Sequence, residues 1–124
     1  MSTRTRPTGW PARVPPPITG PAADQWQGAA VGWLLDHCPP EYRGHALLQR
    51  QPEVLARLTA WHVQAQESAT RQGLALARTE FRGLGAPVVD DTLLLLEREL
   101  VRLQVLTRGV AALEHAFSQG ARSA

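Results

Sequence analysis

The chain has 124 residues, with 13 arginines, no lysine, 11 acidic residues and one cysteine, and a formal net charge of +2. This length fits one domain, and a hydrophobic content of 44% is enough to build a core. A lone cysteine excludes an internal disulfide, and the apolar run at residues 93–96 is far too short to cross a membrane. No apolar segment follows the first arginines as it does in a secretory signal, so we expect a cytoplasmic protein.

Residues 1–21 form an arm that holds six of the ten prolines, three arginines (Arg4, Arg6 and Arg13) and no acidic residue. Proline excludes helix and central strand here, so the arm is predicted to be extended or disordered. Trp10 is the candidate anchor that would dock the arm on the body. The arginines and Trp10 also allow weak, salt-sensitive contact with nucleic acid, although the rest of the chain carries a charge close to zero.

The first predicted helix (helix A) covers residues 24–38. Asp24 is the expected N-cap, with Gln27 completing a capping box. Apolar residues recur on one face at Trp26, Ala30 and Trp33. Pro39 and Pro40 end the helix, and a connector follows over residues 39–51, with one short turn near residues 46–48.

Two long helices follow, over residues 52–82 (helix B) and 91–119 (helix C). Pro52 suits the first turn of helix B, the break at residues 83–87 contains two glycines and a proline, Asp90 is the expected N-cap of helix C, and Gly120 closes it. The short break makes the helices antiparallel neighbours. The fold class is therefore all-α: a long antiparallel helical hairpin and a shorter N-terminal helix form a three-helix bundle, with residues 22–120 as a single domain.

Helix B is predicted to face helix C through small residues, Ala65, Ala69 and Ala77, against a leucine-rich seam like that of a coiled coil. Helix C carries a second apolar stripe, and helix A is too short to cover the far end of the hairpin. Uncovered apolar surface of this kind marks an interface. The candidate interface residues are Leu74, Phe81, Leu94, Val101 and Val105, and a homodimer is expected.

No pattern points to catalysis, a cofactor or a metal. His37, Cys38 and His45 do not have the spacing of a zinc site, and Glu-x-x-His, phosphate-binding and nucleophile motifs are absent from the sequence. Cys38 is interpreted as structural, because it follows the C-terminal end of a helix, which does not lower a thiol pKa.

Two segments, WLLDHCPPEYR at residues 33–43 and PEVLARLTAWHVQAQ at residues 52–66, resemble a group of small uncharacterised actinobacterial proteins. The resemblance implies no activity. It draws attention to a set of residues in the two segments: Asp36, Cys38, Pro39, Pro40, Tyr42, Arg43, His62 and Gln66. If helix A packs near the start of helix B, a polar cluster forms from Asp36, Tyr42, Arg43, Arg57 and His62, either as a structural lock or as a ligand site.

Three functions remain open from the sequence. The first is a non-enzymatic helical module for protein–protein interaction or self-association. The second is a small-ligand-binding or regulatory bundle that uses the polar cluster near His62. The third is a weak nucleic-acid accessory protein that acts through the basic arm.

Overall fold

The computed structural model describes residues 5–123, with side chains to residue 120, and this part contains helices, turns and extended segments but no strand. The all-α class is therefore confirmed. There are four α-helices rather than three, with 3₁₀ turns at Pro40–Gly44 and Arg82–Leu84. The α-helices are α1 (Ala23–Asp36), α2 (Ala46–Arg50), α3 (Pro52–Glu80) and α4 (Ala86–Ser123). The expected turn near residues 46–48 is the short helix α2.

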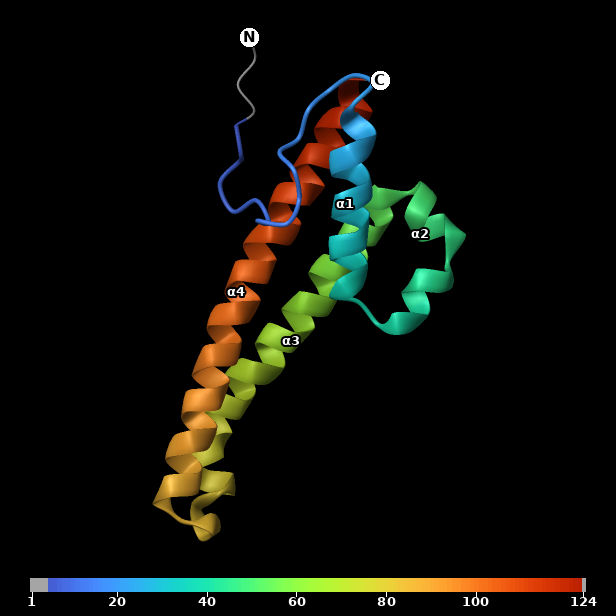
Figure 1. Ribbon diagram of the computed structural model, residues 1–124. Helices are drawn as coiled ribbons and strands as arrows, with labels where there is room; N and C mark the ends of the chain where they lie inside the picture. Colours follow the sequence, from blue (N-terminus) through green and yellow to red (C-terminus); the bar gives the residue numbers. More distant parts are fainter. Residues whose placement is uncertain (1–4, 124) are drawn as a thin grey trace.

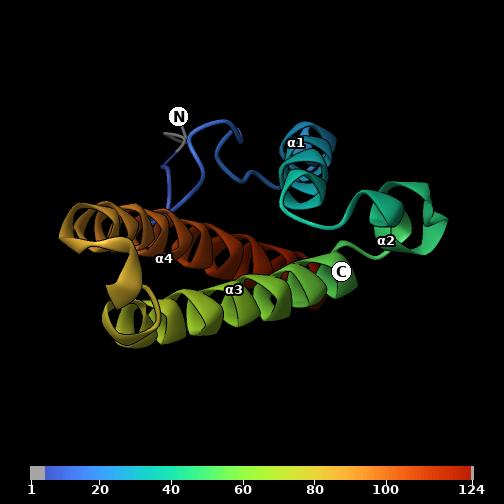
Figure 2. The same ribbon diagram turned by 90° about the horizontal axis from the view of Figure 1, so that it is seen from below.

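Helices α3 and α4 lie side by side and run in opposite directions (Figure 1). The arm, α1 and α2 all pack near the end of this pair where α3 begins and α4 finishes, which we call the covered end. The other end, where α3 turns into α4, projects without a third helix beside it and is called the free end (Figures 1 and 2). No helix in the described part of the chain is long and apolar enough to cross a membrane.

The seam between α3 and α4 joins small residues on α3 to large residues on α4. Val63 packs with Leu103 and Leu106, and Ala77 packs with Val89 and Leu93. The buried residues of α3 recur at intervals of three, four and seven, as in a coiled coil. They are Leu55, Ala56, Thr59, Val63, Thr70 and Ala77.

The small residues of this seam differ from those expected. Ala77 is buried as predicted, but Ala65 and Ala69 are exposed, whereas Thr59 and Thr70 are buried. Each threonine hydroxyl donates to the carbonyl four residues earlier, over 2.7 Å for Thr59 and 2.9 Å for Thr70. Because the hydroxyl is hydrogen-bonded within the helix, burying a threonine leaves no polar group without a partner. The side chain then packs as a small residue.

The arm is docked rather than free, and it completes the core at the covered end. Trp10 exposes only 6% of its surface, and its indole N–H donates to the carbonyls of Val14 and Pro15. Its ring lies 5.6 Å from that of Trp26, which in turn stacks on Phe117 at 5.1 Å. Residues of the arm, α1 and α4 therefore share one cluster with the start of α3.

Five of the six predicted helix ends differ from the sequence prediction, and two of these are early ends: α1 stops at Asp36 rather than residue 38, and α3 at Glu80 rather than residue 82. Helix α1 begins after Ala22 with no side-chain cap, so Asp24 lies in the first turn and is not the N-cap. Helix α4 begins at Ala86, because Pro87 fits a first turn, so Asp90 lies within the helix. It also continues through Gly120 to Ser123. The left-handed residue of the break is Gly85, with φ of 99°.

A glycine in α4 permits close contact at the covered end. A Cβ atom at Gly109 would lie 2.9 Å from a ring carbon of Trp33 and 3.2 Å from Pro11, whereas one at Gly28 in α1 would meet nothing within 4 Å. We expect Gly109→Ala to lower the free energy of unfolding by about 1–3 kcal/mol, because Trp33 and the arm must move. Gly28→Ala is the matched control, and we expect it to raise stability by about 0.5–1 kcal/mol. Denaturant unfolding measures both, and equal effects would contradict the contact.

Candidate functional site

The clearest surface feature is an apolar stripe along α4, made of Leu94, Val101 and Val105 and called here the α4 stripe. These side chains expose 45%, 61% and 58% of their surface. Their spacing of seven and four residues keeps them on one face of the helix. The stripe runs from the free end to the place where the arm reaches α4 at Arg108, whose Cβ lies 3.1 Å from a Cβ built on Gly9. Helices α1 and α2 lie at the covered end, away from its start (Figure 1).

The other two residues of the candidate interface have different positions. Leu74 is half-buried and packs against the core of the free end, with Ala77, Val89 and Leu93. Phe81 follows the last residue of α3 and is partly exposed at the turn. Leu95 follows Leu94 in the chain and exposes 67% of its surface, but it was not among the predicted interface residues. In the run of four leucines at residues 93–96, residue type does not distinguish the leucines that face α3 from those that face solvent, because all four are equally apolar.

The charges near the α4 stripe are separated by sign. Acidic residues lie toward the free end and basic residues toward the covered end: Asp90, Asp91 and Glu97 against Arg98, Arg102 and Arg108. Arg102 is paired with Glu99 on the same helix, at 2.5 Å. In the part of the chain that the structure describes, the other five make no ion pair. Apart from Glu99 and Glu114, which are paired with Arg102 and Arg57, helix α4 therefore presents an acidic half and a basic half along its exposed face.

The expected polar cluster forms only in part. The Arg43 guanidinium lies 2.5 Å from the Asp36 carboxylate, which links the turn after α1 to the end of that helix. Tyr42 is half-buried against the core of the covered end. Arg57 is directed to α4, where it pairs with Glu114 at 2.8 Å. Of the five residues, Asp36 and His62 share a cleft.

This polar cleft has a volume of about 260 Å³ and lies between the end of α1, the middle of α3 and α4. Its polar walls include His37, His62, Gln66 and Arg102 beside Asp36. Burial lowers the pKa of His37, and the positive charge of Arg102 lowers it further, while Asp36 opposes the shift. The imidazole of His37 is also held edge-on to Trp33, with the ring centroids 4.7 Å apart.

Cys38 lines the same cleft as a thiol. Burial raises its pKa, and its Sγ lies 3.1 Å from the Thr59 hydroxyl, which partly offsets the shift. A raised pKa disfavours the thiolate that a nucleophile or metal ligand requires. Within residues 5–123, no three histidine, cysteine or acidic side chains are grouped as a metal site would need.

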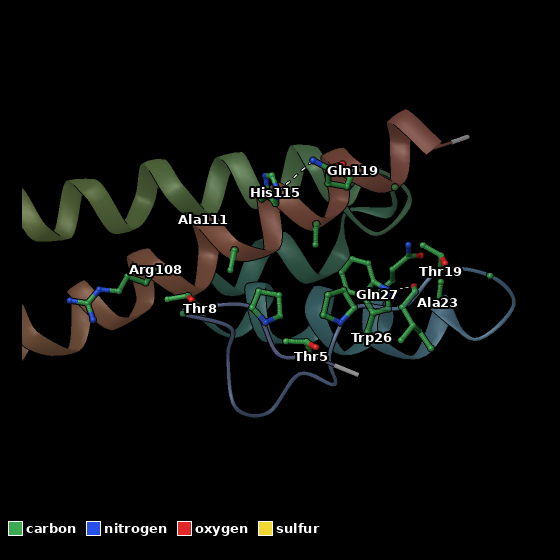
Figure 3. A pocket seen from close by; sticks show the side chains of 18 residues that line it. Thr5, Thr8, Thr19, Ala23, Trp26, Gln27, Arg108, Ala111, His115 and Gln119 are labelled. Atoms are coloured by element: carbon green, nitrogen blue, oxygen red, sulfur yellow. Dashed lines mark hydrogen bonds between the residues drawn. The ribbon is translucent and has the colours of Figure 1, made fainter. Parts of the chain in front are cut away.

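A larger groove, of about 1110 Å³, lies beneath the arm and was not anticipated from the sequence. The arm passes along one side, α4 forms the other, and Trp26 of α1 lies between them (Figure 3). Arg108 and Thr8 lie at one end, and Gln119 and Thr19 lie toward the other. The groove exists because the arm packs against α4. The sequence predicted only an extended or disordered arm, so it could not predict the groove.

No protein family, curated protein or solved structure matches this chain. The function must therefore be inferred from the geometry of these three surfaces.

The lowered pKa of His37 predicts acid sensitivity. Below the ordinary histidine pKa of 6.5, the unfolded chain gains a proton that folded His37 resists. We therefore expect the free energy of unfolding to fall as the pH drops from about 6.5 through the lower pKa of the folded protein, and the loss to be complete below that pKa.

His37→Gln should flatten this pH dependence, measured by urea unfolding at a series of pH values. His45→Gln is the control for loss of an exposed imidazole outside the cleft. An unchanged slope in His37→Gln would contradict the expectation.

Proposed function

We propose that this protein is a non-enzymatic helical interaction module that forms a homodimer through the α4 stripe. The observation that carries the proposal is the exposure of Leu94, Val101 and Val105 on one face of α4, which no other part of the described residues covers along the stripe. Contiguous apolar surface is costly in water and is commonly buried by a partner. The α3–α4 pair supports the helix from behind, so its face is rigid before association.

The charge pattern of α4 favours a second copy of this chain as the partner. If two α4 helices pack in opposite directions, the acidic half of each faces the basic half of the other. Leu94 of one copy then lies near Val101 or Val105 of its partner, in the spacing of a coiled coil. Parallel packing would instead place like charges together. Self-complementarity of this kind is a property of one helix and needs no other protein to explain it.

In the proposed module, the covered end is a three-helix bundle of α1, α3 and α4, as expected from the sequence. The free end is a helical hairpin that carries the interface. The module is taken to work in the cytoplasm.

Two other functions have less support. A ligand site in the polar cleft is favoured by the meeting of Asp36 and His62 there, but about 260 Å³ lies below the range of about 300–1,000 Å³ typical of small-molecule pockets. Nucleic-acid binding through the arm has fewer free donors to offer a phosphate, because Arg6 is already hydrogen-bonded to the carbonyls of Pro11 and Val14. Arg4 lies outside the described residues.

The dimer is tested by light scattering on a sizing column. We expect a dimer for the natural chain and a monomer for Leu94→Arg combined with Val101→Arg, because two unpaired cations would enter an apolar contact. The dissociation constant should rise at least about a hundredfold, which corresponds to about 2.8 kcal/mol. Substitution is preferred to deletion of the arm, which would remove Trp10 and Val14 from the core.

Leu47→Arg is the matched control, because Leu47 exposes 54% on α2, at the covered end. It should leave the dimer intact. Circular dichroism confirms that all variants keep their helices. A monomer at every concentration of the natural chain, or a dimer in the double variant, would overturn the proposal.

A further inference from the structure

We propose that the groove beneath the arm binds an elongated apolar molecule that carries one carboxylate at its end. The groove shares Arg108 with the basic half of α4 but none of the apolar residues of the α4 stripe, so its apolar lining does not depend on the dimer. It follows from the groove's lining, its rigidity and its charge.

The lining is mainly apolar. Helix α4 contributes the methyl groups of Ala111, Ala112 and Ala116, with His115 among them, and the arm contributes Pro17 and Ile18. The polar atom of Trp26 is already used, because its indole N–H donates to the Ile18 carbonyl at 3.0 Å. A molecule in the groove therefore meets mainly carbon, as an aliphatic chain would require.

The arm is fixed on both sides of the groove, so the space is formed before a ligand arrives. At one end Trp10 is buried, and Arg6 donates to the carbonyl of Val14 at 2.8 Å. At the other end the bond from Trp26 holds Ile18. Between these anchors α4 presents Ala111, Ala112 and Ala116, which are too small to fill the gap, beside the exposed His115. A preformed site avoids the entropic cost of ordering a loop on binding.

The charge of the groove selects an anion. None of its 18 lining residues is acidic, and Arg108 supplies a positive charge at one end. Thr8 lies beside the stem of Arg108, whose exposed guanidinium is directed outward from that end and makes no ion pair within the described residues (Figure 3). His115 is hydrogen-bonded to Gln119 at 3.4 Å. A carboxylate near Arg108, with its chain directed under the arm, satisfies both the charge and the apolar lining.

The volume agrees with this class of ligand. At about 1110 Å³ the groove is slightly larger than the range of about 300–1,000 Å³ for small-molecule pockets, and more than four times the volume of the polar cleft. It is long rather than round, since Thr8 and Thr19, which belong to two separate lining segments of the arm, lie toward its opposite ends (Figure 3).

Binding is tested with cis-parinaric acid, a fluorescent long-chain carboxylate, added to the full chain. We expect its emission to rise and the tryptophan emission to fall by energy transfer, because Trp26 lines the groove. Ala111→Trp places a large ring on an exposed lining position and should weaken binding at least about tenfold. Ala75→Trp is the matched control on the exposed face of α3, outside the groove, and should bind as the natural chain does.

The head group is tested separately. Arg108→Gln should weaken binding of the acid but leave binding of its methyl ester unchanged, because the ester carries no charge. The mass of each variant is measured as well, so a change in dimerisation is not mistaken for a change in binding. Absence of any energy transfer, or equal affinity in Ala111→Trp and Ala75→Trp, would overturn the proposal. Equal loss of acid and ester in Arg108→Gln would overturn the carboxylate assignment.

Discussion

The close approach of α3 to α4 is the contact on which the other features depend. It is possible because α3 offers small side chains along its seam, and a Cβ atom at Gly73 would already lie 3.2 Å from Leu96. At 1.5 Å per residue, the 29 residues of α3 extend about 43 Å, whereas the 14 residues of α1 extend about 21 Å. One short helix can therefore cover about half of the pair, and the rest must be covered by another molecule or remain in water.

The arm divides the remaining surface of α4 into two sites of different character. It reaches the helix at Arg108, where Gly9 allows close contact. On one side the helix presents exposed Val101 and Val105, which suit a flat helical partner. On the other side alanines face the arm across a groove that suits a narrow molecule. The proposed dimer and the proposed ligand thus use adjacent stretches of the same helix.

The sequence was sufficient to identify the helices but not all the faces they bury. Periodicity predicted the three longer helices, and Trp10 was recognised as a possible anchor. The buried face of α3 was misplaced because Ala65 and Ala69 were expected to be buried, whereas Thr59 and Thr70 are buried with their hydroxyls satisfied within the helix. A helical wheel that places residues 100° apart also rotates by about 20° per heptad relative to a contact seam that repeats every seven residues, so its predicted buried face moves away from the real one along a long helix. The polar cleft was predicted in part. It contains Asp36 and His62, but Arg57, which was expected there, forms an ion pair with Glu114 on α4 instead. The groove depends on contacts distant in sequence, which periodicity does not report.

The aromatic cluster at the covered end has a consequence for how the chain folds. Trp10, Trp26 and Phe117 meet in space although about ninety residues separate the latter two. Helices α3 and α4 can pair by local contacts, but this cluster closes only after Phe117 has left the ribosome. Until then Trp10 and Trp26 lack the surface of α4 on which they pack. We therefore expect the cluster to close late in folding, and the nascent chain to be open to proteolysis and aggregation until it does.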